Sequence, residues 1–291
     1  SSNKNYSQIL NAKTIVIKIG SSILIDPKKN ALKTKWLNSL LDEIAFLKKN
    51  GKNIIIVSSG SIALGKSVLN LSSKKLKLDE SQASAAIGQI KLAQAYDLIL
   101  KKYNIYTAQI LLTSDDSQNR RRYLNIRSTF KSLLKMGVIP IVNENDTVAT
   151  EEIKFGDNDR LAAQVALITE ANLLILLSDI DGLYDKDPNI NPDAKHLALI
   201  KEVTRKMLNM ASQTTSENSK GGMVTKLEAA KICMNSGCFM AIANGKHAQP
   251  LSKLIKTNIC TWFIPKVSRL DARKKWIVSS IESNGKIYID N

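Results

Sequence analysis

Runs of apolar residues alternate along this chain with stretches in which apolar residues recur at helical spacing. Residues 14–19 form a strand-like run that ends at Gly20, and apolar residues then repeat every three or four positions over 36–47. A second apolar run, residues 53–58, follows the Asn50-Gly51 pair that closes this helical stretch. Strands that alternate with helices predict an α/β protein, a three-layer αβα sandwich with a mostly parallel central sheet.

The same alternation continues to about residue 243 and predicts the remaining elements. Further helices are predicted at residues 81–102, 121–136, 158–169 and 223–235, and further strands at 105–112, 138–142, 173–177 and 239–243. We expect two lobes, one over residues 1–170 and one over residues 171–265. Residues 266–291 read as a linker and a lone hairpin.

Composition narrows the class of protein. Hydrophobic residues make up 44% and charged residues 23%, as in ordinary globular proteins. The net charge of +16 suggests an RNA-binding protein, but only 8 of the 42 basic residues are arginine, and the lysines are scattered rather than clustered with aromatic residues. We therefore expect most of this charge to be a solvated surface that also attracts anionic substrates.

The cysteines and the apolar runs bear on location. Cys233, Cys238 and Cys260 form no CxxC pair and have no histidine nearby at metal-binding spacing, so reduced, semi-buried thiols are expected and no metal site is predicted. The sequence contains neither an apolar run of transmembrane length nor the apolar core of a signal peptide. A cytoplasmic protein without membrane contact is the expectation.

Acids and amides gather on both sides of the segment that follows the predicted strand 138–142. Asn143, Glu144, Asn145 and Asp146 come first, and Gly156, Asp157, Asn158 and Asp159 follow. Side chains at the carboxyl end of a parallel strand line a binding site. Ionised aspartate only accepts hydrogen bonds whereas asparagine also donates, so this mixture suits the ammonium and carboxylate groups of an amino acid. A cation or the metal of a polyanion would also suit it, and one aspartate could instead cap the following helix.

Two cationic segments suit phosphate. Lys18 lies within an apolar run, one position before the strand becomes a glycine turn, where a lysine is either an edge-strand residue that reaches solvent or a phosphate-binding cation. Residues 220–226, Lys-Gly-Gly-Met-Val-Thr-Lys, place two glycines at the start of a helix and a lysine one turn inside. Such a segment is either a flexible loop before a helix or a phosphate site, because glycines allow close backbone approach and the helix N-terminus is partially positive.

The segment 60–67, Gly-Ser-Ile-Ala-Leu-Gly-Lys-Ser, matches the P-loop pattern GxxxxGK[ST] and follows a strand. One interpretation is a P-loop NTPase with residues 173–179 as the partner strand that ends in a metal-binding aspartate. The alternative is a helix that begins at Ser61, with Ser59 and the first backbone N–H groups presented to a carboxylate. The apolar residues at positions 62–64 favour the helix.

Six motifs in this order resemble the glutamate 5-kinases of the amino acid kinase superfamily over nearly the whole chain. They are Val-Ile-Lys-Ile-Gly-Ser-Ser, Val-Ser-Ser-Gly-Ser-Ile-Ala, Asn-Glu-Asn-Asp-Thr-Val-Ala, Gly-Asp-Asn-Asp, Leu-Ser-Asp and Gly-Gly-Met-Val-Thr-Lys. The chain departs from the family at Lys220 and Ser219, where relatives usually have Thr and Gly. The resemblance implies the amino acid kinase fold and transfer of a phosphoryl group from ATP, accompanied by Mg²⁺, to the side-chain carboxylate of L-glutamate for proline synthesis.

The resemblance also implies a role for each lobe and each site residue. The N-terminal lobe, residues 1–170, is expected to hold the amino acid substrate, and the C-terminal lobe, residues 171–265, is expected to bind the nucleotide. Glutamate is expected on Ser59, Asn143, Asp146 and Asn158, and the catalytic residues are Lys18, Lys226 and Asp159, the last of which organises the two lysines. The nucleotide is expected on Lys18, Ser178, Asp179, Lys220, Gly221, Gly222, Met223, Val224, Thr225 and Lys226.

Partners and the chain end follow from the resemblance as well. It implies feedback inhibition by proline, a homo-oligomer (dimer or tetramer) and a downstream glutamyl phosphate reductase. Many relatives continue into a small β-rich PUA domain, and residues 266–291 look like its linker and first strand.

Overall fold

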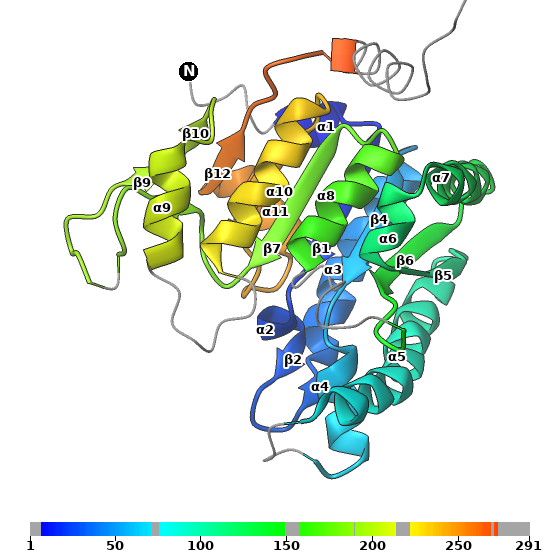
Figure 1. Ribbon diagram of the computed structural model, residues 1–291. Coiled ribbons are helices and arrows are strands. Elements are labelled where there is room, and N and C mark those ends of the chain that lie inside the picture. Colours follow the sequence, from blue (N-terminus) through cyan, green and yellow to red (C-terminus); the bar gives the residue numbers. More distant parts are fainter. Residues whose placement is uncertain are drawn as a thin grey trace, which may run out of the picture.

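One eight-stranded sheet organises the molecule (Figure 1). The computed structural model describes residues 7–71, 76–148, 158–188, 190–213, 222–268 and 271–272. In spatial order the strands are β10 (Leu199–Ile200), β12 (Cys260–Phe263), β11 (Phe239–Asn244), β7 (Leu173–Ser178), β1 (Thr14–Ile19), β4 (Asn53–Ser58), β6 (Ile139–Glu144) and β5 (Thr107–Leu112). Neighbours pair in parallel except β11 with β12, which are antiparallel. The predicted mostly parallel sheet is confirmed.

Helices cover both faces of this sheet. They are α1 (Ser7–Asn11), α2 (Ser21–Leu24), α3 (Thr34–Lys49), α4 (Ser61–Val68), α5 (Leu78–Lys101), α6 (Ser114–Gln118), α7 (Arg120–Lys135), α8 (Asn158–Ile168), α9 (Arg205–Gln213), α10 (Met223–Asn235) and α11 (Pro250–Thr257). Figure 1 shows α8 and α10 side by side across the front of the sheet, with α3 behind it. This arrangement is the αβα sandwich expected from the alternating sequence.

The two faces of β1 belong to two separate hydrophobic cores. Ile15, Ile17 and Ile19 pack with buried residues of α3, α5 and α11, whereas Val16 packs with buried residues of α7, α8 and α10. Because side chains of a strand alternate between its faces, Lys18 lies on the same side as Val16 and faces α8 and α10. The strand thus presents one buried cation to the face of the sheet that α8 and α10 cover.

The position of β1 and β7 makes the carboxyl edge of the sheet a place for ligands. From β1 the chain passes through α3 to β4 on one side, whereas from β7 it passes through α9 and α10 to β11 on the other side and over the opposite face. Open α/β sheets bind ligands outside the carboxyl ends of the strands where the direction of winding reverses. Here that point lies between β1 and β7, which pair from Ile15↔Leu173 to Ile19↔Leu177.

The P-loop-like segment is a helix. Helix α4 begins at Ser61, directly after Gly60, whose φ of 103° is a left-handed conformation that favours glycine. A Cβ atom at Gly65 would overlap the backbone of Ser84, and one at Gly88 would overlap the backbone oxygen of Ser61. The glycine that completes the pattern therefore allows α4 and α5 to pack closely, and the alternative of a phosphate-wrapping loop is wrong.

Several boundaries differ from the sequence prediction. Strand β6 continues through Asn143 and Glu144, so the first polar residues lie inside the strand and not after it. Helix α5 begins three residues earlier than predicted, at Leu78, and the Glu80 carboxylate in its first turn accepts from the backbone N–H of Lys77. Two small hairpins, β2 (Ile25–Asp26) with β3 (Ala31–Leu32) and β8 (Leu183–Tyr184) with β9 (His196–Leu197), were not predicted.

No described helix is both long and apolar enough to cross a membrane. The predicted hairpin within 266–291 falls almost entirely outside the described residues.

Candidate active site

A carboxylate shared by two lysines lies beneath the carboxyl ends of β1 and β7. Asp159 Oδ1 lies 2.7 Å from Lys18 Nζ, and Asp159 Oδ2 lies 3.0 Å from Lys226 Nζ. The side chains of Lys18, Asp159 and Lys226 are 7%, 0% and 8% exposed. Burial removes the water that would screen these charges, so each interaction is stronger than it would be on the surface. Two ammonium groups and one carboxylate give this cluster a net charge of +1.

Three elements far apart in the sequence bring this cluster together. Lys18 comes from the last residues of β1, Asp159 is the second residue of α8, and Lys226 is the fourth residue of α10. The Thr225 hydroxyl lies 3.2 Å from Asp159 Oδ2 and 2.8 Å from the carbonyl oxygen of Gly222. An ion pair between Arg160 and Glu228 further joins α8 to α10. The structure therefore brings together all three residues predicted as catalytic.

An amide network lies beside the cluster, one residue away from Asp159. Asn158 Nδ2 lies 3.0 Å from each of three acceptors, the Ser58 carbonyl, Ser59 Oγ and Asn143 Oδ1. These contacts join the ends of β4 and β6 to the first residue of α8. Ser59, Asn143 and Asn158, three of the residues predicted to bind the amino acid, are thus direct neighbours. Asp146, the fourth, lies half-buried in the turn after β6.

Apart from Lys18, which belongs to β1 itself, the described residues predicted to bind the nucleotide come from the end of β7 and the start of α10. Ser178 ends β7 and is buried, and its hydroxyl donates to the exposed carboxylate of Asp179 at 3.2 Å. Gly222 is the N-cap of α10, so its backbone precedes the helix that carries Met223, Val224, Thr225 and Lys226. Lys220 and Gly221 lie outside the described residues. The free N–H groups of a helix N-terminus favour phosphate.

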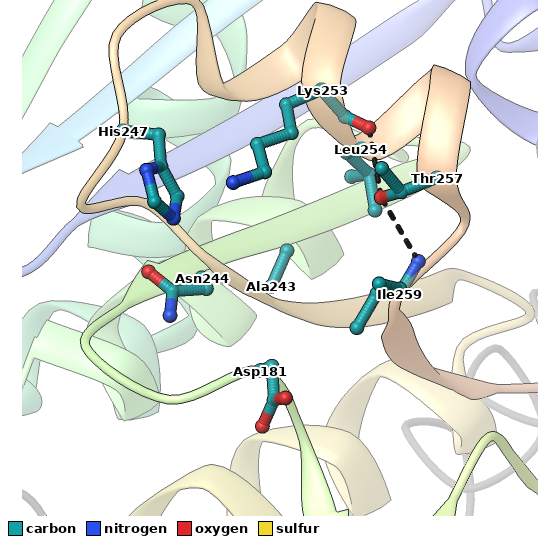
Figure 2. Close-up of a pocket in the computed structure, with 8 residues that line it drawn as sticks. All are labelled: Asp181, Ala243, Asn244, His247, Lys253, Leu254, Thr257 and Ile259. Atoms are coloured by element: carbon teal, nitrogen blue, oxygen red, sulfur yellow. Dashed lines mark hydrogen bonds between the residues drawn. The ribbon is translucent and has the colours of Figure 1, made fainter.

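A cavity of about 200 Å³ lies further along this edge, at the carboxyl end of β11. In Figure 2, His247 and Lys253 lie on one side of the opening and Asp181 lies on the other. Asn244 of this cavity pairs in register with Ser178, so the cavity is next to the end of β7. It contains none of the three clustered charges and is separate from them.

In the described part of the chain, no three His, Cys, Asp or Glu residues lie close enough together to hold a metal ion.

Sequence reasoning missed several buried polar residues around the amide network. Gln89 Oε1 accepts from Asn143 Nδ2 at 2.8 Å, and Tyr96 OH lies 2.8 Å from Ser58 Oγ. Desolvation by burial raises the pKa of Tyr96. Both residues belong to the buried stripe of α5, together with Ala85, Leu92 and Ile99. A polar residue at helical spacing within an apolar stripe was the available signal.

Comparison with known proteins identifies the family to which this chain belongs. The model of the amino acid kinase family matches residues 13–244. The solved structure of carbamate kinase from Giardia lamblia superposes with a TM-score of 0.61 and 18% identity, covering 88% of this chain and 99% of that one. An isopentenyl phosphate kinase superposes with a TM-score of 0.59 and 17% identity, covering 86% and 99%. Fold and motif order therefore define an α/β protein of the amino acid kinase class.

Relatives of higher identity narrow this class. The chain is 53% identical over 280 residues to the glutamate 5-kinase of Pelagibacter ubique, covering 96% of this chain and 76% of the relative. It is 52% identical over 276 residues to the glutamate 5-kinase of Agrobacterium fabrum, covering 95% and 71%. The chain belongs to the glutamate 5-kinases of the amino acid kinase family.

Proposed function

We propose that this protein transfers the γ-phosphoryl group of ATP to the side-chain carboxylate of L-glutamate, giving L-glutamyl 5-phosphate and ADP, the first step of proline biosynthesis. The observation that carries the proposal is the contact between two kinds of site. A buried pair of lysines sharing Asp159 adjoins, through Asn158, an amide network suited to an amino acid. Relatives with this activity in their names match the chain over 95–96% of its length.

The amide network supplies what an amino acid substrate requires. We assign glutamate to Ser59, Asn143, Asp146 and Asn158. The Asn158 amide nitrogen is committed to three acceptors, so its carbonyl oxygen is the atom oriented to accept from a substrate ammonium. The first turn of α4 begins directly after Gly60 and has no side-chain cap, so its backbone N–H groups suit the α-carboxylate.

The reaction itself requires charge neutralisation and alignment. A γ-carboxylate oxygen of glutamate attacks the γ-phosphorus of ATP, the bond to the bridging β–γ oxygen breaks, and ADP leaves with that electron pair. The attacking carboxylate carries no proton to remove, so no general base is needed. Lys18 and Lys226 offset the repulsion between two anions, which is about 4 kcal/mol per pair of like unit charges at 4 Å and an effective dielectric of 20.

Asp159 positions the lysines in this scheme. Each of its oxygens is in contact with an ammonium group, at 2.7 Å and 3.0 Å. A carboxylate held in this way is a poor proton acceptor, because protonation would break a buried ion pair. We therefore assign Asp159 the orientation of Lys18 and Lys226 and not the role of a base.

The nucleotide is assigned to the second half of the chain. We place it on Ser178, Asp179 and the segment 220–226, so that residues 1–170 hold the acceptor and residues 171–265 hold ATP. Both halves share one continuous sheet through the pairing of β1 with β7. The accompanying metal is proposed to be Mg²⁺, which enters bound to ATP and neutralises phosphate charge; no protein side chain is assigned to it.

Trapping of the acyl phosphate tests the function directly. Hydroxylamine converts an acyl phosphate into a hydroxamate, so the protein, ATP and Mg²⁺ are incubated with glutamate, aspartate or N-acetylglutamate. We expect ATP-dependent hydroxamate with glutamate and little with the other two. If more hydroxamate formed with aspartate or N-acetylglutamate, that compound would replace glutamate as the assigned substrate. If no hydroxamate formed with any of the three, the proposed function would be refuted.

Three further proposals rest on the family. Proline is proposed as a feedback inhibitor, because it carries the same α-carboxylate and ammonium type of groups as glutamate. A dimer or tetramer and hand-over of the labile acyl phosphate to glutamyl phosphate reductase are proposed in addition. A cytoplasmic location is supported by Cys233, Cys238 and Cys260, which are buried and unbridged.

A further inference from the structure

Gln89 lies at the far end of the amide network, on the side of α5 that faces α4 and β6. It is 8% exposed, and its Oε1 accepts from Asn143 Nδ2 at 2.8 Å. Asn143 Nδ2 also lies 3.3 Å from Ser61 Oγ, at the start of α4. Gln89 therefore touches the residue that the proposed function assigns to glutamate, from the side opposite Asn158.

The orientation of these amides is determined by a backbone donor. The N–H group of Glu144 donates to Asn143 Oδ1 at 2.8 Å, which fixes Asn143 Oδ1 as the acceptor and leaves Nδ2 on the other side. Because Asn143 Nδ2 donates, the atom of Gln89 that it meets is the carbonyl oxygen. Asn143 Oδ1 in turn accepts from Asn158 Nδ2 at 3.0 Å. Each amide thus fixes the orientation of the next.

Stability does not explain a glutamine at this position. Gln89 Nε2 is buried and finds no hydrogen-bond partner among the residues that the structure describes. A buried donor without a partner destabilises the folded state, and an apolar side chain of the same length would avoid that cost. Residues that cost stability in this way are expected where function requires them.

We propose that Gln89 is a positioning residue for the amino acid substrate. Its Oε1 holds the Asn143 amide, which holds the Asn158 amide in the orientation that receives glutamate. The inference rests on the proposed function. Because the contacts run from Gln89 through Asn143 to Asn158, and only then to Asp159 and the lysines, Gln89 affects glutamate binding and leaves ATP binding unchanged.

The test compares steady-state kinetics of Gln89→Met with the wild type. Methionine is similar in length to glutamine but cannot accept from Asn143 Nδ2. We expect the KM for glutamate to rise about tenfold, as for loss of one buried hydrogen bond that orients a site, while the KM for ATP and kcat change by less than about twofold. Ser84→Ala is the matched control, since Ser84 is also buried on α5 with a hydroxyl that has no partner in the described structure. It should change neither KM.

A double-mutant cycle separates positioning from a general packing role. If Gln89 acts through Asn143, then Gln89→Met has little further effect on glutamate KM in an Asn143→Ala background. Additive effects, or an unchanged glutamate KM in folded Gln89→Met, would overturn the inference. Gln89→Leu is the second variant, and failure of both variants to fold would assign Gln89 to structure alone. Failure of the proposed function is a different result, because the wild type would then form no hydroxamate with glutamate.

Discussion

Lys18 and Asp159 form a buried ion pair whose charged atoms lie 2.7 Å apart, although one residue belongs to the first strand of the sheet and the other to α8. Transfer of either charge from water into the interior would be costly without the other. The lysine in the apolar run of β1 is therefore explained by a partner that lies 141 positions further along the chain. Lys226 completes the arrangement on the second oxygen of the same carboxylate.

Asp159→Asn should reduce both activity and stability. Asparagine keeps the size of the side chain but leaves two buried ammonium groups without their shared charge. We expect kcat to fall by at least about 100-fold and the free energy of unfolding to fall by about 3 to 5 kcal/mol, measured by hydroxamate formation and urea unfolding. Asp193→Asn is the control, because the pair of Asp193 with Lys186 is largely exposed and should contribute under about 1 kcal/mol. Full activity of Asp159→Asn would remove Asp159 from the site.

Lys18→Ala and Lys226→Ala should lower turnover more than they raise the KM for glutamate. Both ammonium groups are assigned to the transferred phosphoryl group, whose charge arrangement changes in the transition state, whereas glutamate is held by other residues. Steady-state kinetics with each substrate varied in turn measures the two effects. Lys66→Ala tests the P-loop pattern in the same assay, and because Lys66 lies within α4 we expect nucleotide binding to be retained. If either lysine variant had unchanged turnover, that lysine would no longer be counted as catalytic.

Gly65→Ala should destabilise the protein more strongly than Gly137→Ala. A methyl group at Gly65 overlaps the backbone of Ser84, so α4 and α5 must separate. We expect the free energy of unfolding to fall by at least about 3 kcal/mol, at the upper end of the range for overpacked positions. At Gly137 the added Cβ meets nothing within 4 Å. Only the left-handed backbone, with a φ of 79°, disfavours alanine there, and it lowers the free energy of unfolding by about 1 kcal/mol. Urea unfolding compares the two variants, and equal losses would show that the helices separate easily.

The protein should lose stability in alkali through Cys260. Burial raises the pKa of its thiol from 9.0 to about 12. Between these values the folded state keeps a proton that the unfolded state releases, so the stabilising contribution is complete below pH 9.0 and is lost as the pH rises towards 12. Where the two states differ fully, the slope is about 1.4 kcal/mol per pH unit. Urea unfolding of wild type and Cys260→Ala across this range measures the difference, and parallel pH profiles would contradict it.

The fold was largely predictable because each element repeats a simple period. Residues 173–177 are a continuous apolar run, and residues 14–19 are apolar apart from Thr14 and Lys18; both segments are buried on their two faces as central parallel strands. The boundary of β6 was not predictable in the same way. Asn143 and Glu144 are polar and look like loop residues in the sequence. In the fold, the Asn143 side chain forms hydrogen bonds with Gln89, Asn158 and the backbone N–H of Glu144, so this polar residue can be buried within the strand.

The sequence predicted which residues would gather at this edge of the sheet, but it did not predict the geometry of their contacts. A lysine within an apolar run and acids beyond a strand each indicate chemistry, and motif order related them to a family. Which oxygen of Asp159 meets which lysine depends on how β1, α8 and α10 pack, and that follows from contacts between distant segments. Gln89 went unnoticed because one polar residue within an amphipathic helix is a weak signal until its neighbour on another element is known.

The pairing of β1 has a consequence for synthesis of the protein. Strand β1 pairs with β4 on one side. Its partner on the other side, β7, begins only at Leu173. Because translation proceeds from the N-terminus, one edge of β1 stays unpaired until more than half of the chain has been synthesised. Lys18 gains its neighbour on α10 later still. We therefore expect a nascent chain that ends before β7 to expose an apolar strand edge and to need protection from a chaperone.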